Sequence, residues 1–555
     1  MIDVIEALSV VAILAAALVS GSLLAPYVAR VFSRSPSRLD RFLNPLERGF
    51  YRTIGVDPDL VMGWRQYFFS ALLLNIVQMV IAFIILTTQN LLPLDPQGFP
   101  GLRWDLALNT VISFATNTNL QHYAGESTLS YFSQMGAIQF LQFTSAATGI
   151  CVMVALIRGF RAGSTHLGNF YVDFIRTLTR ILIPLCLIAA IVLVALGIPQ
   201  TLGGYTSVKT IEGSTQTVLV GPVASLVSIM QLGTNGGGYY GANSAYPFQN
   251  PNPATDVLEI YLMLLLPTAL VFVFGDLLNK KRETRPILIG TYGLFILDLV
   301  IAFVPPLHAV GPGIETRFGG FFSTFWTVVT TAVTTGSVNA SLGGIHPLAI
   351  LSAFLGMLIQ ATPGGKGVGV MYMVMYIVIT VFIVGLMTGR TPEYLGIKIS
   401  ARDVKLVMVA FLIHPVIILV PTVLAYATRA VDAIPGFNSL PTSVGFTQIL
   451  YEFTTSAANN GSDFLGTAAN TPFFNVATAA VIFVGRFGPI AVLLALAGSM
   501  IGRKRTGEAS LRTDSNTFSF VLIGSILLLV VLTFFPFLIL GPLLAYFQGM
   551  VNFLG

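Results

Sequence analysis

The sequence predicts an all-α polytopic membrane protein with ten transmembrane helices, and three observations support this fold class. Of the 555 residues, 54% are hydrophobic and only 10% are charged, whereas about 25% are charged in a typical soluble domain. Apolar stretches of about 20 residues or more, the length that crosses a hydrocarbon core, recur along the chain. Polar or glycine-rich segments lie between alternate pairs of them. One membrane domain is therefore expected instead of several soluble ones.

Ten stretches are predicted to span the membrane. The first is expected to be a retained helix and not a signal peptide, because "MIDVIEALS" carries two acids and no Lys or Arg before the apolar run. The seventh is too long for one simple helix. The approximate limits are 5–28, 65–89, 131–157, 173–197, 255–278, 287–307, 346–389, 404–428, 474–501 and 518–547.

The basic residues predict the orientation, because cytoplasmic loops collect Lys and Arg. Of the 29 Lys and Arg residues, 22 lie in or beside five alternate loops, after the first, third, fifth, seventh and ninth spans. Both termini are therefore expected outside the cytoplasm. This placement also explains the formal net charge of +5, so no nucleic-acid partner is expected.

Four segments on the opposite side share one layout, which is a polar entry, about a dozen apolar residues and then an abrupt polar or glycine-rich stretch. An apolar part of about 10 to 14 residues is too short to cross and fits a re-entrant helix. The chain therefore predicts four repeated units of span, pore helix, filter and span. The segments read "RWDLALNTVISFATNTNLQ" from Arg103, "VGPVASLVSIMQLGTNGGG" from Val220, "GGFFSTFWTVVTTAVTTGSVNA" from Gly319 and "PTSVGFTQILYEFTTSAANNGSD" from Pro441.

These units divide the chain into six parts. An N-terminal helix with a basic cytoplasmic loop is expected at the start and one further helix at the end. The third repeat is expected to contain a broken second helix. The predicted parts are 1–62 for the N-terminal helix and loop, 63–160, 161–280, 281–392 and 393–505 for the four pore repeats, and 506–555 for the C-terminal helix.

The polar stretches after the short helices predict a cation filter. Non-helical backbone at membrane depth persists only where protein buries it or where it lines a wet cavity. A ring of carbonyl dipoles can replace the hydration shell of a cation. Glycine reaches positive φ at low cost, and in the first repeat, which has no glycine, Asn117 or Asn119 is expected to take that conformation. Any one segment alone also fits a turn, but four in matched positions favour a filter.

Several motifs resemble the KdpA family of potassium-binding subunits of potassium-transporting ATPases, over essentially the whole chain. They are "TNTNLQHYAGE", "GTNGGGYYGANSAYPFQNPNP", "TTGSVNA", "GRTPEYLGIKI", "SAANNGSDF" and "FVGRFGPI". The resemblance implies four channel-like units and selective K+ uptake, with K+ as the transported ion and no bound cofactor. The implied filter residues are Thr116, Asn117, Thr118, Asn119, Gly233, Thr234, Asn235, Gly236, Thr335, Gly336, Ser337, Val338, Asn459, Asn460 and Gly461.

The resemblance also implies a complex in the bacterial plasma (inner) membrane. Its other members are a P-type ATPase catalytic subunit, a single-span chaperone-like subunit and a small accessory membrane peptide. The chain itself has no Asp-Lys-Thr-Gly phosphorylation motif, and "TPGGKGVG" fails the phosphate-loop pattern because Gly367 follows Lys366. Catalysis is therefore expected on a partner. The five histidines have no metal-ligand spacing.

Two features are candidates for a gate or barrier below the filter. The segment "ATPGGKG" at 361–367 is expected to break the seventh stretch near mid-membrane. A mobile crossing loop is favoured over a simple turn between two short helices. Arg486 in "FVGRFG" is costly within a span unless it faces a polar interior, although a helix-end Arg reaching the interface fits equally well. The residues concerned are Pro363, Gly364, Gly365, Lys366, Gly367 and Arg486.

Three functions compete. The favoured one is the ion-binding subunit of an ATP-driven high-affinity K+ uptake pump. A self-standing K+ channel or symporter of the Trk and Ktr type shares the fourfold plan, but the pump-specific motifs and the two extra helices argue against it. A secondary transporter with broken helices is the third, yet inverted repeats would then be expected, and here every unit enters and leaves on the same sides.

Overall fold

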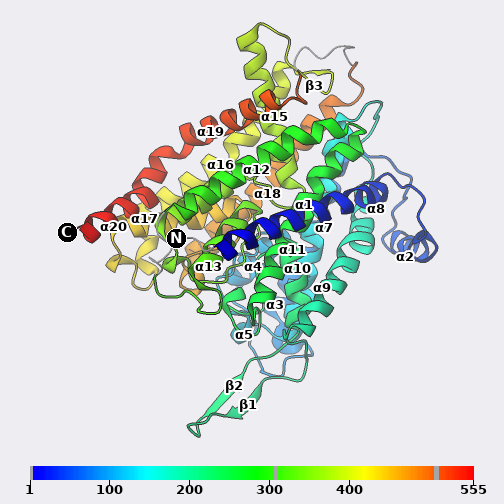
Figure 1. Cartoon of the computed structure of the whole chain (residues 1–555). Coiled ribbons are helices and arrows are strands. Elements are labelled where there is room, and N and C mark those ends of the chain that lie inside the picture. Colours follow the sequence, from blue (N-terminus) through cyan, green and yellow to red (C-terminus); the bar gives the residue numbers. More distant parts are fainter. Residues whose placement is uncertain (1–3, 305–310, 505–511, 555) are drawn as a thin grey trace.

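The computed structural model describes residues 4–304, 311–504 and 512–554, and nearly all regular structure in this part of the chain is helical (Figure 1). Ten of its helical stretches are long and apolar enough to cross a membrane. The predicted all-α membrane class is therefore confirmed. The strands in the described ranges form two short antiparallel hairpins, β1 (Thr206–Lys209) with β2 (Thr215–Val218) and β3 (Glu393–Tyr394) with β4 (Ile397–Lys398).

The chain contains four units of outer span, pore helix and inner span, in chain order. The second outer span begins as α8 (Phe170–Thr177), and the first inner span begins with α6 (Tyr131–Ser133). The third inner span is divided in two. The four units are α3 (Trp64–Thr87), α4 (Trp104–Ala115) and α7 (Phe140–Phe160); α9 (Ile183–Ala195), α10 (Val223–Leu232) and α11 (Pro253–Leu278); α12 (Thr284–Phe303), α13 (Gly319–Ala332), α14 (Pro347–Ile359) and α15 (Val368–Thr388); and α16 (Ala401–Ala427), α17 (Thr442–Ala457) and α18 (Pro472–Met500).

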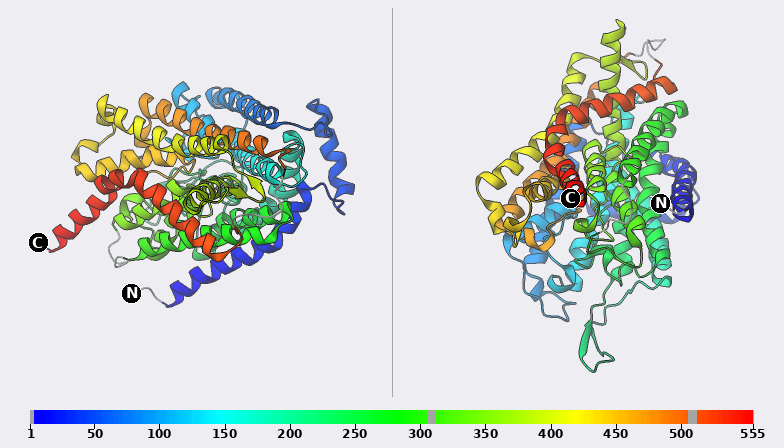
Figure 2. Two further views of the ribbon diagram at one scale, coloured as in Figure 1. Left: turned by 90° about the horizontal axis from the view of Figure 1, so that it is seen from above. Right: turned by 60° about the vertical axis from the view of Figure 1, so that its left-hand side comes forward.

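Two further membrane-length helices flank the four units. The first is α1 (Val4–Phe32), which packs along α11. The last is α19 (Asn516–Leu538), which continues through η10 (Ile539–Leu543), kinked at Gly541, into α20 (Leu544–Leu554). The start of α1 and the end of α20 lie on one side of the molecule, whereas α2 and β3 lie toward the other (Figures 1 and 2). The ten spans in the described part of the chain, an even number, fit this placement of both ends on one side.

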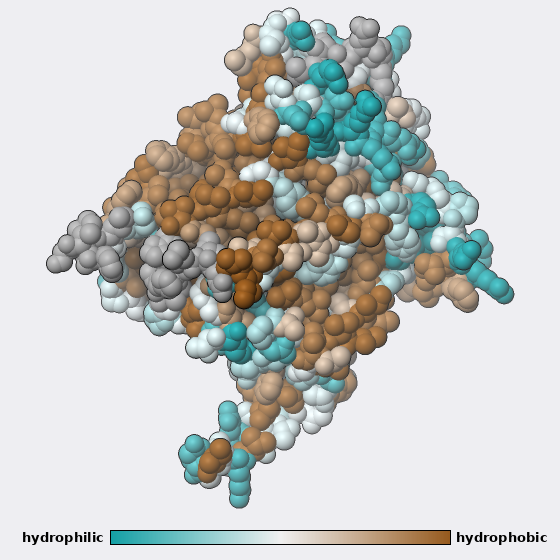
Figure 3. All heavy atoms as spheres, viewed as in Figure 1, coloured by the Kyte–Doolittle hydropathy of each residue, from teal (hydrophilic) through white to brown (hydrophobic). Residues whose placement is uncertain are grey.

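The inner helices surround the centre and the flanking helices face outward. In its most apolar stretch, the span ending with α7 has 89% of its residues buried, whereas α1 has 17%. Large apolar side chains on α1, α9, α16 and α19 are exposed, and hydrophobic residues cover the middle of the surface in Figure 3. A helix with an exposed apolar surface of membrane length is stable only against lipid or another apolar partner. The flanking helices therefore mark the membrane-facing surface.

The seventh predicted stretch is broken where the sequence predicts. Helix α14 ends at Ile359 and α15 begins at Val368. The residues between them include Gly364 and Gly367, with φ of 74° and 73°. Backbone in this left-handed region cannot continue a right-handed helix. We call the segment 360–367 the crossing loop.

The basic segment predicted as a loop contains a helix, α2 (Asp40–Thr53). Its inner face buries Glu47, which pairs with Arg180 at 2.6 Å. Its outer face exposes Phe42 and Leu46. Such an amphipathic helix fits the interface plane of a membrane. The turns on the same side of the molecule as α2 and β3 are rich in hydrophilic residues, which gather at the upper right of Figure 3. We call this side the basic side. The opposite side, which carries β1 and β2, is called the hairpin side.

Candidate functional site

Each pore helix ends in the same backbone turn. The amide nitrogen of Thr118 donates to the carbonyl oxygen of Ser113 at 2.9 Å, five residues earlier. This bond recurs in all four repeats and defines four equivalent segments, 116–119, 233–236, 333–336 and 458–461, which we call the filter segments because they are the candidate cation filter. The other three bonds join Asn235 to Met230 at 2.8 Å, Thr335 to Thr330 at 2.7 Å and Asn460 to Thr455 at 2.9 Å.

The filter segments also share a dihedral pattern. The second and fourth residue of every segment has positive φ. An alternation of this kind turns successive carbonyl groups toward the same side, and it suits glycine at little cost. The first repeat reaches the pattern without glycine, since both Asn117 and Asn119 have positive φ, where the sequence predicts it for one or the other. The φ values are 67°, 35°, 47° and 53° at Asn117, Thr234, Thr334 and Asn459, and 58°, 88°, 94° and 99° at Asn119, Gly236, Gly336 and Gly461.

The structure shifts the register of the third segment relative to the sequence-based range. Residues 335–338 were expected there, but the equivalents of Thr116–Asn119 are residues 333–336. Ser337 and Val338 follow the segment, and Thr334 belongs to it. In the fourth repeat Ala458 joins the expected residues. The signal for this register is a hydroxyl residue five positions before the third position, Thr330 before Thr335 and Thr455 before Asn460.

The four segments form a closed ring. A Cβ added to Gly236 would lie 1.9 Å from the carbonyl oxygen of Thr335 in the next segment. The fourth residue of each segment therefore lies against the third carbonyl of the next one. The same relation joins Gly336 to Asn460 at 1.9 Å, Gly461 to Thr118 at 2.0 Å and, through a close side-chain contact from Nδ2 to O, Asn119 to Asn235. The order is first to second to third to fourth and back to first.

The ring leaves carbonyl oxygens available. Among the described residues, no N–H or O–H donor reaches the carbonyl oxygens of Thr118, Thr335 and Asn460, whereas the amide nitrogens of the same residues donate to their own pore helices. Buried carbonyl groups without donors carry an unmet acceptor capacity. A desolvated cation satisfies that capacity. Each pore helix also directs its partially negative C-terminal end toward the ring.

The crossing loop lies beneath the ring. The amide of Gly364 donates to the carbonyl oxygen of Ala332, the last residue of α13, at 2.8 Å. A Cβ on Gly365 would lie 2.2 Å from Oγ1 of Thr334 in the third filter segment. The loop is therefore in contact with the inner end of the ring.

Arg486 meets the crossing loop from the other side. It lies in the middle of α18, buried, and its guanidinium donates to the carbonyl oxygen of Ser145 at 3.2 Å. A Cβ on Gly149 of α7 would lie 2.6 Å from the Lys366 carbonyl oxygen and 2.8 Å from the Arg486 guanidinium. The loop and Arg486 thus converge at one point of α7. Arg486 faces the protein interior and does not extend to a helix end.

The seams between adjacent segments use different side chains. At the seam of the first and second segments, the Asn117 amide donates to the Thr234 carbonyl oxygen at 2.7 Å. At the seam of the fourth and first, His122 Nε2 lies 3.0 Å from Glu452 and Nδ1 lies 2.7 Å from Asn475. Burial alone would lower the pKa of His122, but the hydrogen bond to Glu452 and its negative charge raise it overall. His122 and Glu452 are not among the site residues that the sequence predicts, although an acid inside a pore helix is a usable signal.

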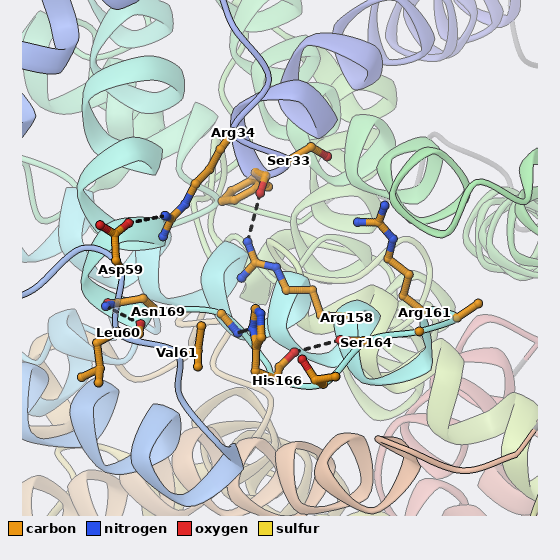
Figure 4. Close-up of a pocket in the computed structure, with 15 residues that line it drawn as sticks. Ser33, Arg34, Asp59, Leu60, Val61, Arg158, Arg161, Ser164, His166 and Asn169 are labelled. Carbon is orange, nitrogen blue, oxygen red and sulfur yellow. Dashed lines mark hydrogen bonds and ion pairs between the residues drawn. The ribbon is translucent and has the colours of Figure 1, made fainter.

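A polar cavity on the basic side is not suited to K+. Figure 4 shows this cavity, of about 480 Å³, between the end of α1, the end of α7 and the start of α8. Arg34, Arg158 and Arg161 line it, and the Arg158 guanidinium donates to the Phe32 carbonyl oxygen at 3.1 Å. Side chains of the same sign repel a cation.

The described residues also contain no group of three or more His, Cys, Asp or Glu side chains that could hold a metal ion. His308 lies outside these residues. The ring of filter segments is therefore the arrangement best suited to bind a cation in this part of the chain.

Fold and site define a class, which is a membrane protein with four tandem channel-like units around one central ring of backbone carbonyls. The solved structure of the potassium transporter TrkH from Vibrio parahaemolyticus has the same overall fold, with a TM-score of 0.53, 15% sequence identity and coverage of 89% of this chain and 98% of that one. A profile of the KdpA family, described as "Potassium-transporting ATPase A subunit", matches residues 11–547. The chain belongs to this family.

Relatives agree over nearly the full length. The potassium-transporting ATPase potassium-binding subunit of Caldanaerobacter subterraneus is 42% identical over 539 residues, covering 94% of this chain and 95% of the relative. The subunits of the same name from Alicyclobacillus acidocaldarius and Gloeobacter violaceus are 45% and 43% identical, covering 93% and 95% of this chain and 94% and 95% of the relatives. The protein is accordingly the K+-binding, non-catalytic subunit of a K+-transporting ATPase.

Proposed function

We propose that the subunit selects K+ at the four filter segments and passes the dehydrated ion to the P-type ATPase catalytic subunit of its complex. The observation that carries the proposal is the closed ring of third-position carbonyl oxygens, three of which have no donor among the described residues. Carbonyl oxygens held at fixed positions compensate the loss of water from an ion of matching size and coordination. Residues 116–119, 233–236, 333–336 and 458–461 form the proposed filter, with Ser337 and Val338 at its edge.

The filter proposal is tested by ion competition in the purified complex. K+-stimulated ATP hydrolysis is measured with Rb+ and Na+ as competitors, for the wild type and for Gly236→Ala. The new Cβ would lie 1.9 Å from the Thr335 carbonyl oxygen, so we expect weaker K+ stimulation and reduced discrimination against Rb+. An unchanged ion preference in a correctly assembled Gly236→Ala complex would contradict the filter assignment.

The proposed orientation places both termini outside a bacterial plasma membrane and the filter at the outer side. It is supported by the 22 basic residues of the alternate loops and by the position of α2 on the same side as β3 (Figure 1). Ions then enter from the hairpin side. The proposed partners, besides the catalytic subunit, are the single-span chaperone-like subunit and the small accessory peptide.

Labelling of introduced cysteines tests the orientation in intact cells. Arg34→Cys and Lys504→Cys should react only with reagents that cross the membrane, whereas Glu212→Cys, beyond β1, should react with an impermeant reagent. The background carries Cys151→Ser and Cys186→Ser, although both thiols are buried. Reaction of the cysteine at position 504 with the impermeant reagent would reverse the proposed topology.

We also propose that the crossing loop and Arg486 stop ions from continuing straight through. Gly365 of the loop lies against Thr334 in the third filter segment, and the Arg486 guanidinium lies beside the loop at Gly149. A fixed positive charge below a filter raises the energy of a cation there. The ion selected by the filter then leaves sideways to the catalytic subunit. An ATP-driven pump requires a closed straight path, because an open pore would dissipate the gradient that the pump builds.

Ion flux into liposomes tests the barrier. The isolated wild-type subunit should show little passive K+ flux, and replacing residues 361–367 with a short Gly-Ser link should increase it by roughly ten-fold or more, the effect of removing about 1.4 kcal/mol from a barrier. Gly-Ser replacement of the exposed turn 212–214 between β1 and β2 is the control. Robust flux through the unmodified subunit would favour the self-standing channel or symporter instead. The repeat boundaries 63–160, 161–280, 281–392 and 393–505 stay a proposal.

A further inference from the structure

Glu259 is a buried carboxyl group beside the filter that the ring itself does not explain. It lies on α11, the inner helix of the second repeat, and its side chain is fully buried. Its Oε2 atom accepts hydrogen bonds from Nε2 of Gln231 at 2.6 Å and from Oγ of Ser244 at 2.8 Å. Its Oε1 atom has no hydrogen-bond partner among the described residues. An ionisable group inside a membrane span is costly and usually serves a function.

The two partners of Glu259 lie on either side of the second filter segment. Gln231 is the penultimate residue of α10, two positions before Gly233, and Ser244 follows the segment in the next turn. The backbone of Ser244 donates to Oδ1 of Asn243, and Nδ2 of Asn243 donates to the carbonyl oxygen of Gly236 at 2.7 Å. One carboxyl group therefore holds both ends of this segment.

The same carboxyl group reaches the third segment through Gln231. The Oε1 atom of Gln231 accepts a hydrogen bond from Oγ of Ser337 at 3.0 Å, and Ser337 directly follows Gly336. Asp256, one turn earlier on α11 and also buried, adds a parallel contact to Nδ2 of Asn339 at 3.0 Å. The seam between the second and third segments is thus fastened to α11.

We propose that Glu259 is a positioning residue for the K+ filter, which acts through Gln231 and Ser244 to set the distance between the second and third filter segments and thereby the ion preference. The inference rests on the proposed filter. Ion discrimination depends on how closely the coordinating oxygens approach the ion and how firmly they are held. Loss of a side chain that fixes two of the four segments should change K+ affinity and ion preference more than the rate of ATP hydrolysis. The reason is that this side chain contacts neither the nucleotide nor the proposed exit path of the ion.

The test uses the whole ATPase complex and separates geometry from charge. Glu259→Ala removes the acceptor of both hydrogen bonds, from Gln231 and from Ser244. Glu259→Gln keeps an oxygen acceptor at the position of Oε2 and places its NH2 group at the position of Oε1, which makes no hydrogen bond among the described residues. Asp298→Ala is the matched control, because Asp298 is buried in the span α12 and neither carboxyl oxygen has a partner in the described part of the chain. The readouts are the KM for K+ and for Rb+ in ATP hydrolysis, and the rate at saturating K+.

For Glu259→Ala we expect the KM for K+ to rise by roughly ten-fold or more, because the buried Gln231 and Ser244 side chains lose their hydrogen-bond acceptor. The ratio of the KM values for Rb+ and K+ should fall, while the rate at saturating K+ stays within about two-fold of wild type. Glu259→Gln should restore the KM to within about three-fold. Asp298→Ala should leave the KM values and their ratio unchanged.

Gln231→Ala should reproduce the Glu259→Ala values, and the double variant should add little, since residues that act through one contact chain are not additive. Unchanged KM values and ratio in an assembled Glu259→Ala complex would overturn the proposal, as would an equal change in Asp298→Ala. If Gly236→Ala alters ion preference and Glu259→Ala does not, only the role of Glu259 fails. If neither alters it, the filter assignment fails first.

Discussion

The first filter segment and the third follow the same backbone path with different residues at the fourth position. Gly336 has φ of 94° and lies against the Asn460 carbonyl oxygen, which no side chain approaches as a donor in the described structure. Asn119 has φ of 58°, and its amide donates to the carbonyl oxygen of Asn235. The fourfold symmetry thus holds for the backbone only. At the seam of the first and second segments a side chain donates to the third-position carbonyl oxygen, and at the seam of the third and fourth segments no described side chain does. The two seams should respond differently to the same exchange.

Gly336→Asn should have the largest effect. The new Cβ would lie 1.9 Å from the Asn460 carbonyl oxygen, so the ring must open even though asparagine tolerates positive φ. Strain of this kind corresponds to roughly ten-fold to hundred-fold weaker apparent K+ affinity. It is measured as the KM for K+ of the complex. Gly98→Asn, at φ of 69° with no atom within 4 Å, is the control and should be neutral.

Asn119→Gly should have a smaller effect, because glycine accepts the backbone and only the amide contact to Asn235 is lost. The net value of one hydrogen bond predicts about two-fold to ten-fold weaker K+ affinity with the order of ion preference unchanged. The same KM measurement checks it. If Asn119→Gly proves as disruptive as Gly336→Asn, the side chain, and not the backbone, determines the first segment.

The smallest expected effect concerns pH at the seam of the fourth and first segments. Hydrogen bonding and charge from Glu452 raise the pKa of His122 above its ordinary value, against the effect of burial. The protonated form therefore stabilises the protein fully below the ordinary histidine pKa, and this stability is lost as the pH rises through the raised pKa. The Tm of the complex should fall over this range, by roughly 1–2 °C for a protein of this size.

His122→Gln should remove that part of the pH dependence while the amide can still contact Glu452. Asp463 lies near His122 and Glu452, and burial together with the Glu452 charge raises the pKa of Asp463 as well. A smaller decrease of Tm with rising pH is therefore expected to remain in His122→Gln and to disappear when Asp463→Asn is added. Glu259→Gln, at the seam of the second and third segments, should leave this pH dependence in place. A wild-type Tm independent of pH across this range would contradict the assignment.

Much of the fold follows from the sequence because it depends on length and polarity. The apolar runs locate the ten spans found among the described residues, and the four shorter runs locate the pore helices. The proline and three glycines of the crossing loop locate the break between α14 and α15. The helix α2 was not predicted, because its apolar residues are few and its stability comes from contacts of Glu47 with α8 and the following turn.

The site was predicted less completely than the fold. Positive φ at Asn117 or Asn119 follows from residue type, but positive φ at both and the register of the third segment do not. In "TTGSV" either threonine fits the pattern, and the choice is made by the bond from Thr335 to Thr330. The support by Glu259 depends on α11 packing against α10, a tertiary relation that composition and spacing do not contain.

Linking the four channel-like units in one chain has a consequence for stoichiometry. In a ring of four identical subunits, any residue introduced beside the pore appears four times, and four buried carboxyl groups around one axis could not all carry a charge. Here Glu259, His122 and Asn119 each occur once, in a cyclic order fixed by the covalent linkage. The ring therefore behaves as an obligate heterotetramer whose members cannot be exchanged or permuted, and each seam can be altered by one mutation without altering the other three.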